Sequence, residues 1–480
     1  MPKILTLTSA LLFVFLILAE GQQNSTLFFM LSTPQANFVN PAVRNECKWM
    51  LGLPVLSSVH AELGNSSFSF HQLLTKQPDN TYLFNGNGVM NRLGRTNYLT
   101  AEAHANLLFV SFWQKKNFFT FSINEKADLF MTYPRDLFDL AWDGNTHFVG
   151  QTAELGRSAV FLNYRREFAV GIARQPSADL VLGIRAKLLF VKLNTSVTRS
   201  KVNLYTDPVT YDLNFNSRLR VNTSLPINVE VNPDNTFSSV SYNGNVKDIL
   251  LNRRNVGLAF DLGFIKYRDE NVTIAGSLLD LGLIRWSRNG YTLDQDGSYF
   301  YNGPLNDTAT NQNSYIRDLA NTIKNDFGIT VKSRPYISFL NPMYYIGATY
   351  ALAKDLNAGA LLSGRINRYR ITSGLTLSLN KTFKQRLSVS LSYSYLYKSL
   401  KNIGLGVKLG KSPVQLYAVS DNILGLIKPL DTKNINIRFG LQFNFGCSHK
   451  EKIGNCGCYW LREAEERRVR NQRLLKKKQI

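Results

Sequence analysis

The sequence predicts an all-β protein: an antiparallel, up-and-down transmembrane β-barrel of about 12–16 strands, with an N-terminal plug-like segment and a short C-terminal helix. Three observations lead to this prediction. A stretch near the C-terminus alternates apolar and polar residues over the length of a membrane-crossing strand. Similar stretches precede it, joined by short turns. Beyond the first 21 residues, no long uncharged apolar segment offers a membrane-spanning helix.

Residues 435–445 are the clearest of these stretches, and we interpret them as the strand that closes the barrel. Successive side chains of a strand point to opposite faces, so the apolar residues share one face and the polar residues share the other. The length suits a tilted strand that crosses a bilayer, which needs about 9–11 residues. Lipid on one face and water on the other is typical of an outer-membrane barrel strand. The apolar face consists of Ile435, Ile437, Phe439, Leu441, Phe443 and Phe445.

Six candidate strands with short turns between them lie upstream of the closing strand. Such a meander is the simplest way to build an antiparallel barrel. A soluble β-sandwich is the alternative, but its outward faces would be polar. Here one face of each strand is apolar and several end in tyrosines, which favours a barrel with aromatic girdles. The strands are expected at residues 344–352, 358–366, 371–379, 387–397, 403–409 and 414–419.

The N-terminal half has the same alternation with longer interruptions. Residues 126–150 show helix-like apolar spacing and predict a long loop with a helical turn. Residues 226–256 predict a loop or a strand that extends beyond the membrane. Residues 287–333 are expected to be the longest segment without strands, with a helix at 314–326. Strands are expected at residues 55–63, 98–112, 117–124, 159–172, 180–193, 197–205, 217–225, 256–264 and 273–286.

The expected domain organisation has four parts. Residues 1–21 resemble a signal peptide, with an apolar run too short for a spanning helix, although an uncleaved anchor is the alternative. Residues 22–50 lack strand alternation and contain a turn at Asn40, Pro41 and Ala42. They form either a plug or periplasmic segment, or an ordered lead-in to the first strand. The barrel is expected at 51–446 and a basic periplasmic tail at 447–480.

The net charge of +22 and the pI of about 9.7 narrow the choice of partners. In an exported barrel we do not expect nucleic acid as a partner. The expected partners are outer-membrane lipid, other anionic headgroups or an acidic ligand. None of the five histidines lies in a nucleophile motif, and no G-x-S-x-G sequence occurs. We therefore expect no enzymatic activity and no cofactor.

The four cysteines are Cys47, Cys447, Cys456 and Cys458, three of them beyond the closing strand. In an exported protein they indicate disulfides, although free thiols or a weak metal site of Cys447, His449, Cys456 and Cys458 remain alternatives. If the N-terminal segment returns to the periplasmic end, a Cys47–Cys447 bond would join it to the closing strand.

The rest of the tail is basic, and residues 460–479 predict a helix with Glu/Arg pairs at i,i+4. Two interpretations stay open. The helix contacts a periplasmic protein or an anionic surface, or it is a solvated tail.

Several blocks together resemble a Bacteroidota family of outer-membrane barrels known only as domain-of-unknown-function family 5723. The early blocks are residues 27–30 (LFFM), 40–44 (NPAVR) and 52–56 (GLPVL). The later ones are 255–263 (NVGLAFDLG), 277–286 (SLLDLGLIRW) and 418–425 (AVSDNILG).

The resemblance implies an outer-membrane location in a Gram-negative bacterium. It also implies distant similarity to fatty-acid-transporter-type barrels and to barrels that accompany type IX secretion and gliding. In the transporter type the Asn-Pro-Ala element belongs to a plug. The resemblance implies no catalytic residues and does not extend to the tail.

Two functions follow as hypotheses. The first is passage or binding of an apolar or amphipathic small molecule, by analogy with the family. The second is a structural or secretion- and gliding-accessory role, in which the barrel docks a periplasmic partner.

Overall fold

The computed structural model describes residues 24–79, 81–233, 236–242, 244–301, 329–367, 370–383, 386–410 and 412–447. The predicted signal peptide, the predicted helices at 314–326 and 460–479, and the tail beyond Cys447 lie outside these residues.

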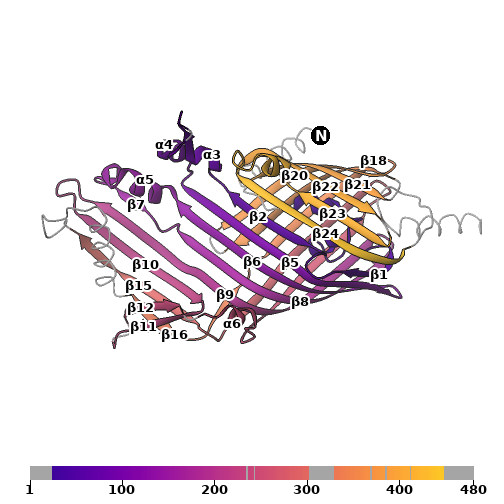
Figure 1. Cartoon of the computed structure of the whole chain (residues 1–480), viewed down its shortest axis with the longest axis horizontal. Helices are drawn as coiled ribbons and strands as arrows, with labels where there is room; N and C mark the ends of the chain where they lie inside the picture. Colours follow the sequence, from indigo (N-terminus) through magenta and orange to yellow (C-terminus); the bar gives the residue numbers. More distant parts are fainter. Residues whose placement is uncertain are drawn as a thin grey trace, which may run out of the picture.

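The strands form a closed antiparallel barrel of 14 strands, which confirms the predicted fold class (Figure 1). Each strand is hydrogen-bonded to the next along the chain, and the last returns to the first. β1 and β2 together make the first barrel strand, because both pair with β5 and with β24. The barrel strands are β1 (Cys47–Gly52) with β2 (Val59–Asn65), β5 (Thr96–Gln114), β6 (Asn117–Pro134), β8 (Ala159–Ser177), β9 (Leu180–Thr206), β13 (Asn255–Tyr267), β14 (Val272–Trp286), β18 (Met343–Ala353), β19 (Leu356–Asn367), β20 (Arg370–Phe383), β21 (Leu387–Leu396), β22 (Ser399–Gly410), β23 (Val414–Ser420) and β24 (Asn434–Cys447).

The barrel closes where β24 meets the first barrel strand. Cys47 lies opposite Cys447 in the β1–β24 ladder, and Val59 lies opposite Phe439 in the β2–β24 ladder. Closure leaves no unpaired strand edge facing lipid. Strand β1 already begins at Cys47, inside the range 22–50 that the sequence pattern assigned to the N-terminal segment.

The first barrel strand is interrupted, which differs from the continuous strand expected at residues 55–63. Residues 53–58 leave the ladder, and β2 begins after them. Pro54 cannot donate a hydrogen bond to a neighbouring strand, so it favours a break. The break presses inward against β24 at Gly440, where a Cβ atom would lie 2.1 Å from the Ser57 carbonyl oxygen.

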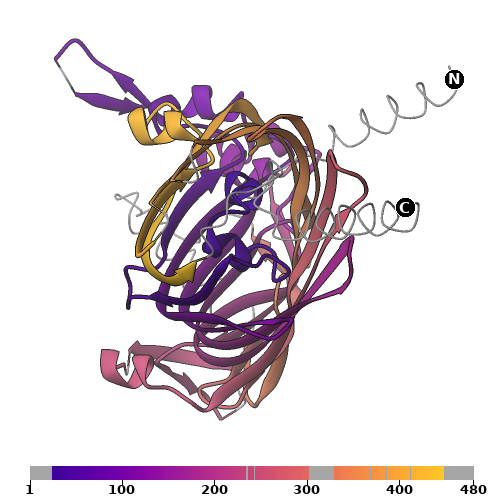
Figure 2. The same ribbon diagram turned by 90° about the vertical axis from the view of Figure 1, so that its right-hand side faces the viewer.

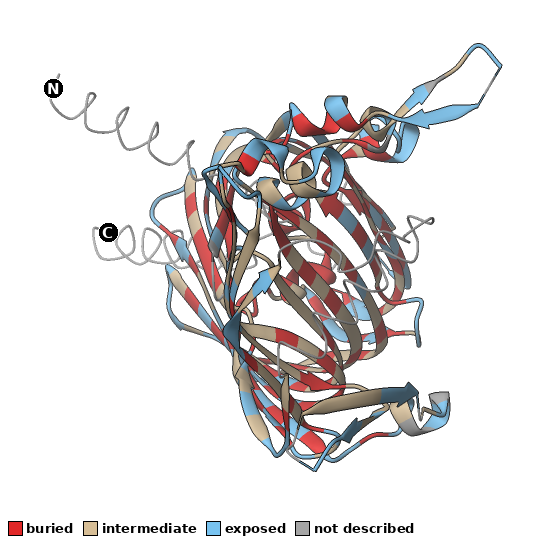
Figure 3. Cartoon of the chain, turned by 90° about the vertical axis from the view of Figure 1, so that its left-hand side faces the viewer, coloured by how far each residue is buried: buried red, intermediate tan, exposed pale blue. Residues whose placement is uncertain are grey.

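Buried and more exposed residues alternate along the strands (Figure 3). The outer face is apolar and the inner face polar, as expected for a membrane barrel. In β9, Leu182 and Ile184 point outward and are 47% and 45% exposed. Arg185 and Lys187 point inward, and each is 4% exposed. Among the described residues, no helix is both long and apolar enough to cross a membrane.

The two ends of the barrel differ in their connections. At the end that contains Cys47 and Cys447, short turns join the strands; we call it the short-turn end. The opposite end carries most of the helices and small strands outside the barrel; we call it the long-loop end (Figure 1). Its elements are α3 (Phe70–Leu73), β3 (Leu74–Lys76), β4 (Tyr82–Phe84), α4 (Gly86–Met90), α5 (Arg135–Asp143), η2 (Thr146–Phe148), β7 (Thr152–Glu154), β10 (Leu213–Ser224), β11 (Ile227–Val231), β12 (Phe237–Tyr242), α6 (Val246–Leu250), β15 (Tyr291–Tyr301), β16 (Thr330–Ser333), β17 (Tyr336–Phe339) and α8 (Ile423–Ile427).

One prediction in this region was wrong. Residues 287–333 include strands β15 and β16, and β15 pairs with β10 along its whole length. Cross-strand ion pairs such as Arg218 Nε to Asp296 Oδ1, at 3.2 Å, stabilise this pairing. A strand that is polar on both faces lacks the apolar alternation by which membrane strands are recognised.

The other errors concern strand length. Residues 126–134 are not a loop, because β6 continues to Pro134 and helix α5 begins only after it. The two strands expected at 180–193 and 197–205 are one unbroken strand, β9. In both cases the strand continues through pairing with its neighbours, β6 with β5 and β8, and β9 with β8 and β10.

Candidate functional site

Residues 24–46, which we call the N-terminal segment, run inside the barrel (Figure 2). The segment contains helix α2 (Ser25–Phe29) and the 3₁₀ helix η1 (Pro34–Phe38). Leu27 and Phe28 are 0% and 4% exposed. Glycines on the inner wall make room for the segment: a Cβ atom on Gly183 would lie 2.3 Å from the carbonyl carbon of Pro41. The segment therefore occupies space that larger wall residues would fill.

The segment is anchored at its start by a buried carboxylate. Asp421, at the end of β23, is 2% exposed and accepts hydrogen bonds from the backbone amides of Asn24, Ser25 and Thr26. The Ser25 and Thr26 bonds measure 3.2 and 2.7 Å. An acceptor at these amides satisfies donors that a helix leaves unpaired in its first turn.

The predicted turn at Asn40, Pro41 and Ala42 joins the segment to the opposite wall. The Asn40 side chain accepts a hydrogen bond from the Ala42 amide at 2.9 Å and donates one to the Phe264 carbonyl at 3.1 Å. The first bond is an Asx-turn, which a short amide side chain supplies to its own backbone. Ser277 Oγ adds a third tie, donating to the Val39 carbonyl at 2.6 Å.

A group of buried charged side chains lies beside the segment, and we call it the ionic layer. Arg165 bonds to Asp128, to Glu167 at 2.8 Å and to Asp280 at 3.5 Å. Lys187 lies 2.5 Å from Asp280, which thus receives a second cation. Burial of charge is costly unless each ion is paired, and here the pairs interlock into a network. The members are Lys126, Asp128, Arg165, Glu167, Arg185, Lys187, Asp261 and Asp280.

Four residues of β2 and β5 face one another next to this layer. His60 lies directly opposite His104, and Glu62 opposite Glu102. The two imidazole rings are 5.2 Å apart. His104 Nε2 is 3.3 Å from the Asp128 carboxylate, which connects these residues to the ionic layer.

An aromatic layer lies nearer the long-loop end. The Tyr98 ring is 6.0 Å from Phe130 and 5.7 Å from Tyr397. The Tyr397 hydroxyl also lies 2.7 Å from Thr100 Oγ1. The layer comprises Tyr98, Phe130, Leu396 and Tyr397, with the partly buried Phe161 against them.

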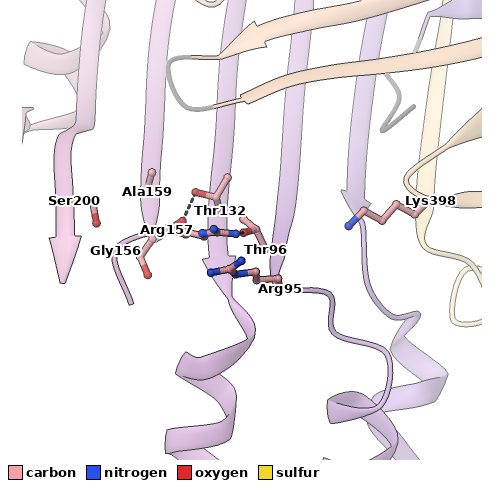
Figure 4. A pocket seen from close by; sticks show the side chains of 9 residues that line it. Arg95, Thr96, Thr132, Gly156, Arg157, Ala159, Ser200 and Lys398 are labelled. Carbon is pink, nitrogen blue, oxygen red and sulfur yellow. Dashed lines mark hydrogen bonds between the residues drawn. The ribbon is translucent and has the colours of Figure 1, made fainter. Parts of the chain in front are cut away.

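Above the aromatic layer lies a cavity of about 530 Å³, which we call the basic cavity (Figure 4). Three cationic side chains line it, Arg95, Arg157 and Lys398, and none of the described lining residues is acidic. Arg157 Nη1 donates to Thr96 Oγ1 at 3.1 Å, and the Thr132 hydroxyl donates to the Arg157 carbonyl at 2.9 Å. The arrangement concentrates positive charge around a partly open cavity.

The aromatic layer lies one step deeper in the barrel than the basic cavity. Thr96, Thr132 and Ala159 line the cavity on β5, β6 and β8. Residues two positions further along each strand lie on the same face, and these are Tyr98, Phe130 and Phe161. A ligand with a negative head and an apolar body would therefore meet both kinds of surface in order.

A larger hollow, of about 780 Å³, lies on the outer wall between β8, β9, β13, β14 and β18. Its sides are outward-facing residues such as Leu182, Ile184 and Leu262. The inward residues Gly183 and Gly263, which stand against the N-terminal segment, form part of its floor. On the lipid-facing wall of a barrel, this hollow suits an acyl chain of the membrane.

The predicted site residues fall into three groups. The closing-strand residues form the outward face of β24, and Cys47 and Cys447 are joined by a disulfide at the short-turn end. His449, Cys456 and Cys458 lie outside the described residues. The sequence pattern missed the basic cavity. Arg95, Arg157 and Lys398 are far apart in the chain, and no local pattern connects them.

A closed antiparallel barrel with an apolar outer face, a polar interior and an internal N-terminal segment is a transmembrane barrel of the outer-membrane type. The chain belongs to the family described as "Family of unknown function (DUF5723)", whose profile matches residues 41–421. No curated protein matched the sequence.

Solved structures of similar fold are distant in sequence. A Pseudomonas aeruginosa FadL homologue is 10% identical with a TM-score of 0.40, over 90% of this chain and 97% of that one. The P. putida toluene transporter TodX is 8% identical with a TM-score of 0.35, over 89% and 95% of the two chains. The translocator domain of the autotransporter NalP from Neisseria meningitidis is 8% identical with a TM-score of 0.33, over 84% and 91%. The function of this chain is therefore inferred from its own side chains.

Proposed function

We propose that this protein is a non-enzymatic outer-membrane barrel that binds an anionic, amphipathic small molecule at its long-loop end. The negative head lies among Arg95, Arg157 and Lys398, and the apolar body points toward the aromatic layer. The long-loop end faces the cell exterior and the short-turn end faces the periplasm, as in other barrels of this class. The tail after Cys447 then begins on the periplasmic side.

The observation that carries this proposal is the basic cavity itself. Its volume of about 530 Å³ is within the range of small-molecule sites, which is about 300–1,000 Å³. Two of the three cations are arginines, which bind carboxylate or phosphate through two parallel bonds, and none of the described lining residues is acidic, so the lining selects for negative charge. The aromatic layer lies one step deeper, and its partly buried member Phe161 offers apolar surface toward which the rest of the ligand points.

Passage through the barrel needs a further step. A cavity of about 50 Å³ lies between the N-terminal segment and the ionic layer, and another of about 20 Å³ lies against the ionic layer alone; both are too small for a hydrocarbon chain. Transport therefore requires residues 24–46 to move, and we propose that this segment acts as a plug. Binding at the cavity requires no such movement.

Binding is tested with a fluorescent fatty acid and with the fatty alcohol of the same length. We expect the double variant R95A/R157A to bind the acid about 10–100-fold more weakly, since each charged hydrogen bond is worth about 1.5 kcal/mol and 1.4 kcal/mol is tenfold. The alcohol should bind the two proteins equally. K428A, which removes an exposed charge at the same end, is the matched control. Equal loss in K428A, or none in R95A/R157A, would contradict the proposal.

A structural or secretion- and gliding-accessory barrel that docks a periplasmic partner is the second candidate, and the filled lumen favours it. Single-channel recording and co-purification separate the two functions. Solute-dependent conductance supports passage. A barrel that stays sealed and co-purifies with one envelope protein supports the accessory role.

A further inference from the structure

The four residues His60, Glu62, Glu102 and His104 have an arrangement that the ligand-binding proposal does not use. They lie at two successive cross-strand pairs of β2 and β5, with all four side chains turned into the barrel. One nitrogen or oxygen atom from each of His60, Glu102 and His104 can be chosen so that all lie within 4.8 Å of one another. Imidazole and carboxylate are ligands that first-row divalent metals accept together.

A hydrogen bond fixes the ring orientation of His60, as is common for histidines that bind a metal ion. Its Nδ1 is 3.2 Å from the Ile437 carbonyl oxygen of β24, so Nδ1 carries the proton and donates it. Its Nε2 therefore presents a lone pair to the interior. This atom is buried, and the described part of the chain gives it no hydrogen-bond partner. A backbone carbonyl on one ring nitrogen and a metal on the other is the common arrangement of a ligating histidine.

The two glutamates are held in matching ways. Glu62 Oε1 accepts the Tyr397 hydroxyl proton, and Glu102 Oε1 accepts from Arg365. The other oxygen of each glutamate faces a histidine: Glu62 Oε2 is 3.5 Å from His60 Nε2, and Glu102 Oε2 is 3.6 Å from His104 Nε2. Each carboxylate thus has one oxygen fixed by a neighbour and the other within 3.6 Å of a histidine Nε2.

One carboxylate of the cluster lacks a direct cationic partner. Glu62 forms no ion pair with a lysine or arginine among the described residues, whereas Glu102 pairs with Arg365. Three guanidinium groups surround the cluster: Arg365 on Glu102, Arg165 on Asp128, and Arg438 of β24, which stands opposite His60. Two neutral imidazoles add ligands without adding positive charge.

We propose that His60, Glu62, Glu102 and His104 form a binding site for a divalent transition-metal ion, with zinc the expected occupant. Zinc bonds of about 2.0–2.2 Å require these side chains to close in by about 1 Å, which rotamer adjustment allows. Small cavities of about 50 and 20 Å³ both reach His104 and are large enough for water to accompany the ion. The metal would link β2 to β5, next to the β2–β24 ladder that closes the barrel.

The test measures zinc bound by the full-length protein after chelation and dialysis against zinc alone. We expect one ion per folded chain, by elemental analysis, and its loss in H60A/H104A. The matched control is H71A/H147A, which removes two surface histidines whose side chains are 58% and 64% exposed. H449A/C456S/C458S separates this site from the tail and should keep the ion.

Cobalt and X-ray absorption spectra of the wild-type protein keep the test informative if H60A/H104A does not fold. Two imidazoles and oxygen ligands, with no thiolate band, support the proposal. A thiolate band, retention of zinc in folded H60A/H104A, or no zinc in the wild-type protein would overturn it.

Discussion

Substitution of Arg165 tests whether the ionic layer behaves as a buried network. Arg165 is 3% exposed and contacts three carboxylates, on β6, β8 and β14. In R165M, Lys126 still lies 3.0 Å from Glu167, and Lys187 still lies 2.5 Å from Asp280. All three carboxylates lose the guanidinium, but only Asp128 is left without a lysine or arginine partner and keeps just His104, at 3.3 Å.

The expected cost follows from that single unpaired carboxylate. Breaking a buried ion pair from one side costs about 3–5 kcal/mol, and the remaining cations place R165M near the lower limit. A loss of about 3 kcal/mol changes the ratio of folded to unfolded protein about 100-fold. R166M is the matched control, because Arg166 is the next residue of β8 and pairs with Glu125 on the opposite face at 31% exposure. A partly exposed pair is worth at most about 1 kcal/mol.

The assay is urea unfolding in detergent micelles or lipid vesicles, followed by the mobility shift that folded barrels show in unheated gels. D128N in the R165M background should recover part of the loss, because the amide needs no counter-charge. If R165M is no less stable than R166M, the interior is hydrated enough to screen these charges, and the buried-network interpretation fails.

Two further predictions concern the N-terminal segment and the closing seam. G183V should raise single-channel conductance, because a Cβ atom at this position would lie 2.3 Å from Pro41 and must displace the N-terminal segment. G297V is the control: a Cβ atom there would have no atom within 4 Å, so the conductance should not change. Unaltered conductance in G183V would show that the wall yields instead. C47S should lower the urea midpoint under non-reducing conditions, since the bond spans 400 residues and chain entropy alone gives an upper limit of about 6 kcal/mol. A reductant should lower the urea midpoint of the wild-type protein to that of C47S, and C456S should have the wild-type midpoint. An unchanged midpoint in C47S would mean that the β1–β24 ladder alone stabilises the closing seam.

The local pattern was sufficient for most of the barrel strands. The six strands expected between 344 and 419 correspond to β18 to β23, because each has one lipid-facing and one inward face and the alternation is written in adjacent residues. It was insufficient for β15, whose polar residues on both faces are stabilised by β10 across the sheet. It also missed the break at 53–58, which depends on the room that Gly440 leaves in β24.

The sequence by itself determined the class of this protein: a transmembrane barrel with an apolar exterior, a polar lumen and a distinct N-terminal segment. Lipid and water impose those properties on every strand separately, so single strands report them. The tertiary structure alone decided which inward residues meet. Arg95, Arg157 and Lys398 line one cavity, and His60 meets His104, only because strand register and barrel closure bring distant residues together. Local alternation specifies the face of a residue, whereas its neighbours across the lumen depend on the closure of the whole barrel.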